Sequence, residues 1–283
     1  MNIKHTDKLT MTLLLSLSLL GCGGGSTTTT TTTTSSSQTE NLGTSSEFQT
    51  QSQVENLSYD RDGKVATIST KNSVSSIAVT KDTLFLSEGE DGVEVIKIGY
   101  NDKVSTEVLF TISDINAQHV TLSKDENKLY IEDEIGFIQI YDISDLSHPK
   151  KIGRTTKQEI DNAAISENKM YKYIPRGEDG LEVVNISNPS NHYIESTYKI
   201  SNAFDVVLVE DDTKALIATG AVGINLLDLS NPKKLDNIAN YRIRGSKVMG
   251  LSLNNTKELL FVATGDKGVM VFNLEILLYK LGH

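Results

Sequence analysis

The sequence has little of what several common function classes require. Its 283 residues include one Cys and no Trp. A single Cys forms no internal disulfide and cannot supply a multi-cysteine zinc or iron–sulfur site. The chain has 37 acidic against 27 basic residues, a formal net charge of −10. This excess of negative charge argues against a nucleic-acid binder, which needs a basic face for phosphates.

Long hydrophobic runs and catalytic signatures are also missing. No apolar run reaches the roughly 18–20 residues of a membrane-spanning helix. The sequence contains no Gly-Xaa-Ser-Xaa-Gly elbow, no HExxH pair, no phosphate loop and no dinucleotide-binding fingerprint. These absences favour a protein that is not an enzyme.

The N-terminus has the pattern of an export signal. Lys4 and Lys8 accompany an apolar segment, residues 9–20, which is too short to span a bilayer. The segment ends in Leu-Leu-Gly followed by Cys22, the only Cys of the chain. This order resembles the lipobox of bacterial lipoproteins, although an ordinary secretory signal with an incidental Cys is the alternative.

The lipoprotein resemblance implies that residues 1–21 are a signal peptide and that Cys22 becomes the lipidated N-terminus. Two or more acyl chains give stable anchoring. Residue 23 is Gly and not Asp, which by the sorting pattern of such lipoproteins favours the outer membrane, with the protein facing the periplasm or the cell surface. The acidic remainder is repelled by anionic headgroups, so the lipid alone is expected to hold the protein at the membrane.

A tether is predicted between the lipid and the folded part. Residues 22–60 hold eight consecutive Thr, three consecutive Ser and few apolar side chains. Such a segment cannot repay the entropy of folding. We interpret it as a disordered tether with a reach of roughly 35 Å.

The rest of the chain, residues 61–283, is a five-fold repeat. A turn glycine followed by an alternating apolar strand recurs at intervals of 44, 44, 43 and 45 residues. The five glycines are Gly92, Gly136, Gly180, Gly223 and Gly268. Each unit divides into four short strands, which in the second unit are expected at 118–123, 128–133, 137–143 and 150–155.

Four strands in about 44 residues, repeated five times, predict an all-β fold, a five-bladed β-propeller of four-stranded blades. A lone strand that begins at Lys64 precedes the first unit and resembles the fourth strands. We expect it to complete the last blade and close the ring, which removes open sheet edges. The alternative is that residues 277–281 pair as a strand of their own.

The repeat resembles that of the LVIVD-repeat proteins. The best matches are Gly180-LEVVNISNPS and Gly223-INLLDLSNPK. The first unit departs from the pattern, and the fifth ends before its Asn-Pro. The resemblance covers about 220 residues and implies a secreted or surface-attached propeller. It carries no catalytic residues.

A ring of polar residues is predicted at the start of the strands that should line the central channel. The aligned positions are Ser76, His119, Asn162, Asp205 and Met249. The polar members could bind a ligand, and His119, Asn162 and Asp205 could hold a cation. The alternative is that they only hydrate the channel or cap turns. Acidic turns before the glycines are a second place for a divalent cation, although their spacing fits no known calcium loop.

These features favour a membrane-anchored lipoprotein whose propeller is a non-enzymatic binding or scaffold module of the cell envelope. Its expected partner is an envelope protein or glycan, with no nucleic acid and no resident cofactor beyond the divalent cation considered above. The alternative is a metal-dependent hydrolase or lyase with its site at the channel mouth.

Overall fold

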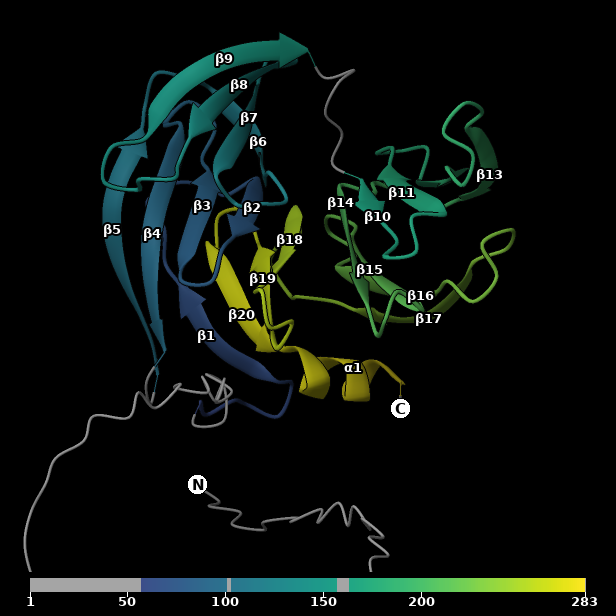
Figure 1. Cartoon of the computed structure of the whole chain (residues 1–283). Helices are drawn as coiled ribbons and strands as arrows, with labels where there is room; N and C mark the ends of the chain where they lie inside the picture. Colours follow the sequence, from purple (N-terminus) through teal and green to yellow (C-terminus); the bar gives the residue numbers. More distant parts are fainter. Residues whose placement is uncertain (1–56, 101–102, 157–162, 283) are drawn as a thin grey trace, which may run out of the picture. The chain divides into compact units, whose positions relative to one another are not determined.

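The computed structural model describes residues 57–100, 103–156 and 163–282, which form five four-stranded antiparallel sheets (Figure 1). Residues 1–56, and with them the predicted signal peptide, Cys22 and most of the tether, lie outside the described residues. The expected five-bladed β-propeller is confirmed.

The blades are named here in chain order, and the strands of each run from the centre outward. The first holds β2 (Ser76–Val79), β3 (Thr83–Ser87), β4 (Val93–Tyr100) and β5 (Val104–Ile112). The second holds β6 (Ala117–Leu122), β7 (Lys128–Asp133), β8 (Phe137–Asp142) and β9 (Lys150–Thr156). The third holds β10 (Ala164–Ile165), β11 (Tyr171–Pro175), β12 (Leu181–Asn185) and β13 (Tyr193–Tyr198). The fourth holds β14 (Asp205–Val209), β15 (Lys214–Ala218), β16 (Ile224–Asp228) and β17 (Asp236–Tyr241). The fifth holds β18 (Gly250–Leu253), β19 (Leu259–Ala263), β20 (Val269–Asn273) and β1 (Lys64–Ile68).

The last blade is completed by the N-terminal strand, as expected. β1 pairs antiparallel with β20, with Ile68 opposite Val269. The fifth blade then meets the first through a hydrophobic cluster to which both contribute, including Ile77 and Phe261. The first strands face the middle of the ring, and the fourth strands lie outside (Figure 1).

A Gly-Xaa-Xaa-Gly turn joins the second and third strands in four of the five blades. In these four blades its last glycine has positive φ, from 72° to 110°. A Cβ at Gly180 would lie 2.2 Å from the carbonyl oxygen of Tyr198 in the outer strand. Glycine is therefore required twice over, by the left-handed backbone and by the approach of the neighbouring strand.

In the same four blades the first glycine of the turn ties the blade to the next one. Gly177 exchanges two backbone hydrogen bonds of 2.9 Å with Ala203, which precedes the first strand of the fourth blade. Equivalent bridges join Gly89 to Ala117, Gly220 to Val248 and Gly265 to Val74. In the second blade the register places Glu134 at the matching position, and the junction that follows includes residues 157–162, outside the described residues.

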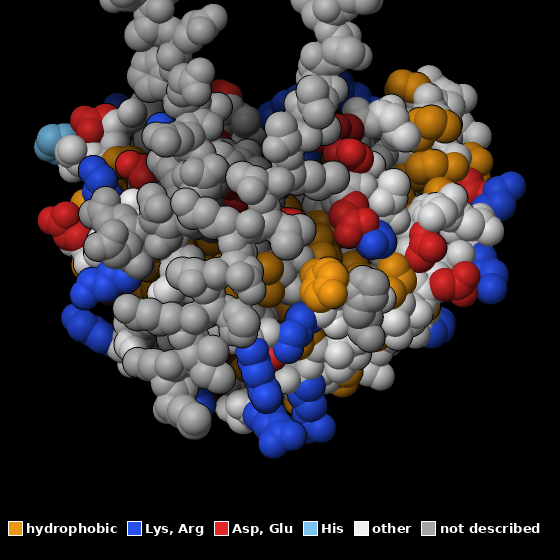
Figure 2. Space-filling model, turned by 90° about the horizontal axis from the view of Figure 1, so that it is seen from below, with side chains coloured by type: hydrophobic (Ala, Val, Ile, Leu, Met, Phe, Trp, Pro, Cys, Tyr) orange, Lys and Arg blue, Asp and Glu red, His pale blue; other side chains and the backbone are white. Residues whose placement is uncertain are grey.

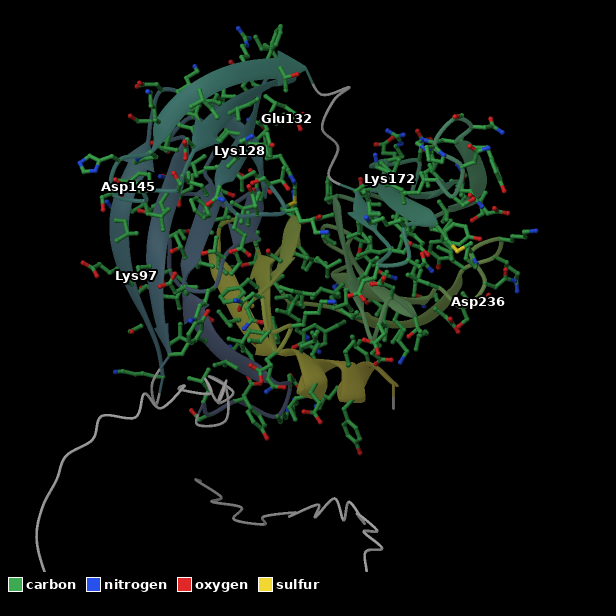
Figure 3. All side chains as sticks on the ribbon, in the orientation of Figure 1. Lys97, Lys128, Glu132, Asp145, Lys172 and Asp236 are labelled. Atoms are coloured by element: carbon green, nitrogen blue, oxygen red, sulfur yellow. The ribbon has the colours of Figure 1, made fainter. Side chains whose placement is uncertain are left out.

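The recurring Asp/Asn-Xaa-Ser after the third strand stabilises the next turn. The Oδ1 atom of Asp142 accepts hydrogen bonds from the N–H and the hydroxyl of Ser144, at 3.0 and 2.6 Å. Asn185 with Ser187 and Asp228 with Ser230 repeat this pair. Three residues after Asp142, the Asp145 side chain accepts from the N–H of Ser147 in the same outer turn (Figure 3).

The C-terminal segment is a helix and not the alternative strand. Asn273, at the position equivalent to Asp228, accepts the N–H of Ile276 at 3.0 Å and so caps the start of α1 (Leu274–Gly282). Leu274, Leu277 and Leu281 share one helical face and are buried against the fourth and fifth blades. Apolar spacing of three and four residues suits a helix and not a strand.

The described residues contain no helix long and apolar enough to cross a membrane. Seen from below, the surface carries lysine, arginine and acidic side chains with hydrophobic side chains among them (Figure 2).

We predict that Gly180→Ala is far more damaging than Gly177→Ala, although both lie in one turn. A Cβ at Gly177 (φ +57°) meets nothing within 4 Å, so only the left-handed strain of about 1–2 kcal/mol is expected. At Gly180 the outer strand must also move, and a loss of about 3 kcal/mol or more is expected. Urea unfolding of both variants measures the difference, and equal losses would contradict the close approach.

Candidate ligand site at the centre of the propeller

Residues of all five blades line a small cavity of about 360 Å³. Each blade contributes at least one apolar residue to its lining, and the aligned ones are Ile77, Val120, Ala163, Val206 and Leu251. Each of the first four directly follows a residue of the predicted polar ring. The lining is nonetheless largely polar, because Thr121, Ser123, Lys124, Glu126 and Ser252 also belong to it.

Asp205 lies in this lining and is buried, with 7% of its surface exposed. Its two carboxylate oxygens accept backbone hydrogen bonds, one from Val206 and one from Leu251 of the next blade, both at 2.8 Å. Burial raises the pKa of Asp205 to about 7, and the two N–H donors oppose that rise. The side chain thus joins two blades while remaining close to its titration point near neutral pH.

Ser76 makes the equivalent link between the first and second blades. The N–H of Val120 donates to Ser76 Oγ at 3.3 Å, and this oxygen lies 3.5 Å from the Val120 carbonyl oxygen. Ser76 is fully buried and is not part of the cavity lining. Its hydroxyl therefore holds two blades together and does not face the cavity.

His119 lines the same cavity as Asp205 and occupies the position equivalent to Ser76. It stands opposite Glu132 in the neighbouring strand. Asn162 lies outside the described residues. In the fifth blade Gly250, opposite Ala263, takes the position that Asp205 takes opposite Ala218, so the alignment of Met249 with this ring was one residue off.

The acidic turns do not gather into a cation site. Glu88 Oε2 accepts from the side-chain amide of Asn72 at 3.1 Å, and Glu134 Oε2 accepts from that of Asn116 at 2.8 Å. Burial raises the pKa of Glu88, although the Asn72 hydrogen bond lowers it. Within the described ranges, no three His, Cys, Asp or Glu side chains lie close enough together to hold a metal ion.

The comparisons with known proteins agree with this architecture. The sequence profile of the LVIVD repeat matches residues 116–156 and 160–199. These two stretches are LVIVD repeats. Each match spans one blade, the second and the third, from before its first strand to the end of its fourth. The LVIVD repeat is therefore a blade of this propeller, and a propeller of such repeats suits a binding or scaffold module.

Solved structures resemble the fold at low identity. A chain of the crystal structure of the mitotic checkpoint complex is 8% identical with a TM-score of 0.53, over 76% of this chain and 96% of that one. The RRP9 WD40 repeats are 8% identical (TM-score 0.48; 74% and 96% covered). A structural genomics protein of unknown function from Bacteroides thetaiotaomicron is 13% identical (TM-score 0.47; 75% and 71% covered). A search of curated proteins finds no significant match.

Sequence reasoning missed how the blades are joined. The first glycine of each Gly-Xaa-Xaa-Gly turn was visible in four units, and its recurrence three residues before the turn glycine was the available signal. Nothing in the sequence showed that its partner is the backbone of the following blade.

We predict that Asp205 makes the protein less stable as the pH rises. Its folded pKa of about 7 lies above the ordinary value of 3.8, so its stabilising contribution is complete below about pH 3.8 and is lost as the pH rises through 7. For one proton, the free energy of unfolding falls by at most about 1.4 kcal/mol per pH unit in that window. Urea unfolding from pH 4 to 8 measures it.

The variant Asp205→Asn isolates the effect. The difference in unfolding free energy between wild type and this variant should decline from pH 4 to 7 and then level off. Ser76→Ala removes the equivalent link without a titrating group, so its difference should not vary with pH. Two flat differences would show that Asp205 is ionised throughout.

Proposed function

We propose that this chain is a membrane-anchored lipoprotein whose propeller acts as a non-enzymatic binding module in the cell envelope. The lipobox pattern at Cys22 supports the anchor, and the Thr/Ser-rich segment supports a tether. The binding role rests mainly on one observation: the polar residues that recur in the repeat serve the fold. Asp205 and Ser76 bind backbone of the next blade, and Asp142 with its equivalents binds a turn.

The recurring polar groups of the repeat form hydrogen bonds within the fold. They therefore do not supply a reactive site that all blades share. The side chains that differ between blades are then the ones available to recognise a partner. A propeller presents such differences on broad, rigid faces formed by its connecting turns. The expected partner is an envelope protein or glycan that contacts one of these faces.

The anchor is tested with Cys22→Ser in the native cell. The wild-type chain should incorporate a clickable fatty acid and sediment with membranes, whereas the variant should lose the label and leave the membrane fraction. An unlabelled wild-type chain, or a variant that keeps its label, would contradict lipidation at Cys22.

The binding role is tested by crosslinking in whole envelopes, with the lipidated protein as bait. We expect a stoichiometric protein or glycan partner that is also captured by a soluble form starting near Ser58. Capture of nothing by either form would argue against the binding module.

The second candidate is a hydrolase or lyase at the channel. It is favoured by His119 and Asp205 lining one cavity and by the pKa of Asp205 near 7, a value suited to proton transfer at neutral pH. Analogy to other propellers allows this chemistry but does not argue for it.

Metal analysis separates the two candidates. His148, which pairs with Asp145 in an outer turn at 3.2 Å, supplies the control variant. The binding proposal predicts that wild type, His119→Ala and His148→Ala carry no stoichiometric divalent ion. An ion bound to wild type and His148→Ala, but lost in His119→Ala, would instead support the channel enzyme.

A further inference from the structure

Two of the five arginines stand apart from the rest. Arg61, Arg154 and Arg176 each lie within ion-pair distance of a carboxylate, Asp62, Asp133 and Glu182. Arg242 and Arg244 have no such partner among the described residues. Both side chains are exposed, in a chain whose net charge is −10.

Both arginines belong to the connection between β17 and β18, residues 242–249. This connection borders three adjoining hollows that share Arg242, with volumes of about 520, 520 and 590 Å³. Arg244 borders two of them, and Lys247 borders the one on the turn face of the fourth and fifth blades. We call these three hollows together the arginine groove.

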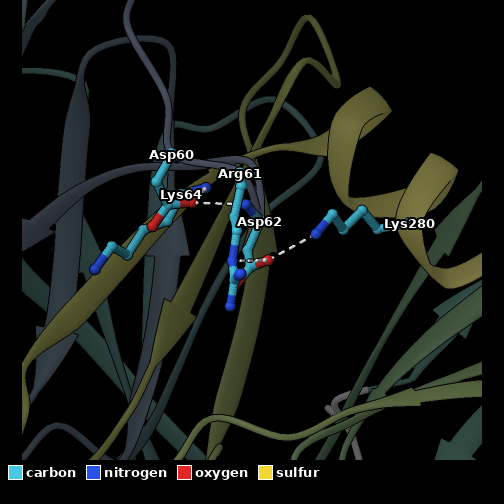
Figure 4. Close-up of polar contacts among 5 residues, drawn as sticks. All are labelled: Asp60, Arg61, Asp62, Lys64 and Lys280. Carbon is cyan, nitrogen blue, oxygen red and sulfur yellow. Dashed lines mark hydrogen bonds and ion pairs between the residues drawn. The ribbon is translucent and has the colours of Figure 1, made fainter. Parts of the chain in front are cut away.

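The groove is positively charged although the protein is acidic. Five basic and three acidic side chains line it, a net charge of +2: Arg61, Lys64, Arg242, Arg244 and Lys247 against Asp60, Asp62 and Asp266. Two of the three carboxylates are engaged (Figure 4). Asp62 pairs with Lys280 at 2.8 Å, and Asp60 accepts the N–H groups of Asp62 and Lys64.

A buried hydroxyl without a partner lies in the same place. Ser246 Oγ is shielded from solvent and makes no hydrogen bond to any described residue, yet Ser246 lines the hollow that Arg242 and Lys247 border. A shielded polar group without a partner is costly. Rotation of the Ser246 side chain toward the hollow would let an acceptor oxygen of a bound ligand satisfy it.

We propose that the arginine groove binds a compact ligand with two or three phosphate or carboxylate groups. The arginine guanidinium binds phosphate and carboxylate alike through paired hydrogen bonds. The volume of each hollow suits a small molecule. A long polyanion fits less well, because the acidic remainder of the surface repels it. This inference rests on the proposed binding function and gives it a site and a ligand class.

The first test is titration calorimetry of the full chain in an uncharged detergent, with inorganic triphosphate, citrate and orthophosphate as probes. We expect saturable binding of triphosphate or citrate in the sub-millimolar range at about 50 mM salt, weakening as salt is added, and weaker binding of orthophosphate. Preference for triphosphate or for citrate identifies phosphate or carboxylate as the recognised group. No saturable binding of any probe would overturn the proposal.

Variants then locate the site. Arg242→Gln with Arg244→Gln should weaken binding about tenfold or more, since two charge-assisted contacts are lost. The control pair, Lys199→Gln with Lys267→Gln, removes the same charge from exposed side chains outside the groove and should change the affinity less than about twofold. If both pairs of substitutions lowered the affinity equally, the effect would come from the overall charge of the protein. That result would overturn the site.

Ser246→Ala separates binding from folding. Removing a hydroxyl without a partner should leave the free energy of unfolding unchanged or slightly higher, while affinity for the probe falls. An unchanged affinity would remove Ser246 from the site.

Envelope crosslinking with the Arg242→Gln, Arg244→Gln bait distinguishes the two proposals. If wild type and variant capture a partner equally and no probe binds, the groove is not the ligand site. The proposal of a binding module would be unaffected by that result. Loss of the partner in this variant alone would support the groove as the recognition site.

Discussion

The close approach of backbone at the Gly-Xaa-Xaa-Gly turn is the constraint on which the rest of this propeller depends. The last glycine allows the outer strand to pass within a distance that no Cβ would tolerate, and the first glycine bonds to the backbone of the next blade. One turn therefore sets both the geometry of a blade and its position relative to its neighbour. Because these contacts are made by backbone, the side chains around them are free to differ between blades.

Polar side chains in the interior also join neighbouring blades. Asp205 and Ser76 occupy equivalent positions and reach across to the backbone of the next first strand, about 45 residues away in the sequence. A serine makes this link without a charge, whereas the buried aspartate has its pKa raised to about 7. The link that the aspartate makes between the fourth and fifth blades is therefore expected to depend on pH. The link that the serine makes between the first and second blades is not.

The connections between the blades differ from one another in their exposed side chains. The connection that follows the fourth blade carries Arg242, Arg244 and Lys247 beside an unsatisfied hydroxyl, whereas the other arginines are paired. Because backbone and recurring polar residues secure the fold, the exposed side chains of such a connection are free to differ between blades. The proposed binding module and the proposed ligand site in the arginine groove both use such a variable connection.

The sequence by itself determined the number of blades, the four strands of each, the turn glycines and the strand that closes the ring. These features follow from local periodicity and from the steric demands of single residues, which recur visibly every 43–45 positions. Only the tertiary structure decided where the polar side chains point. The predicted channel ring proved to hold blades together at Ser76 and Asp205, and residues 274–282 formed a helix over the fourth and fifth blades. The arginine groove joins Arg61 and Lys64 to residues about 180 positions later in the chain. Such placements depend on which backbone lies opposite a side chain, and that is fixed by the closing of the ring and not by any local pattern.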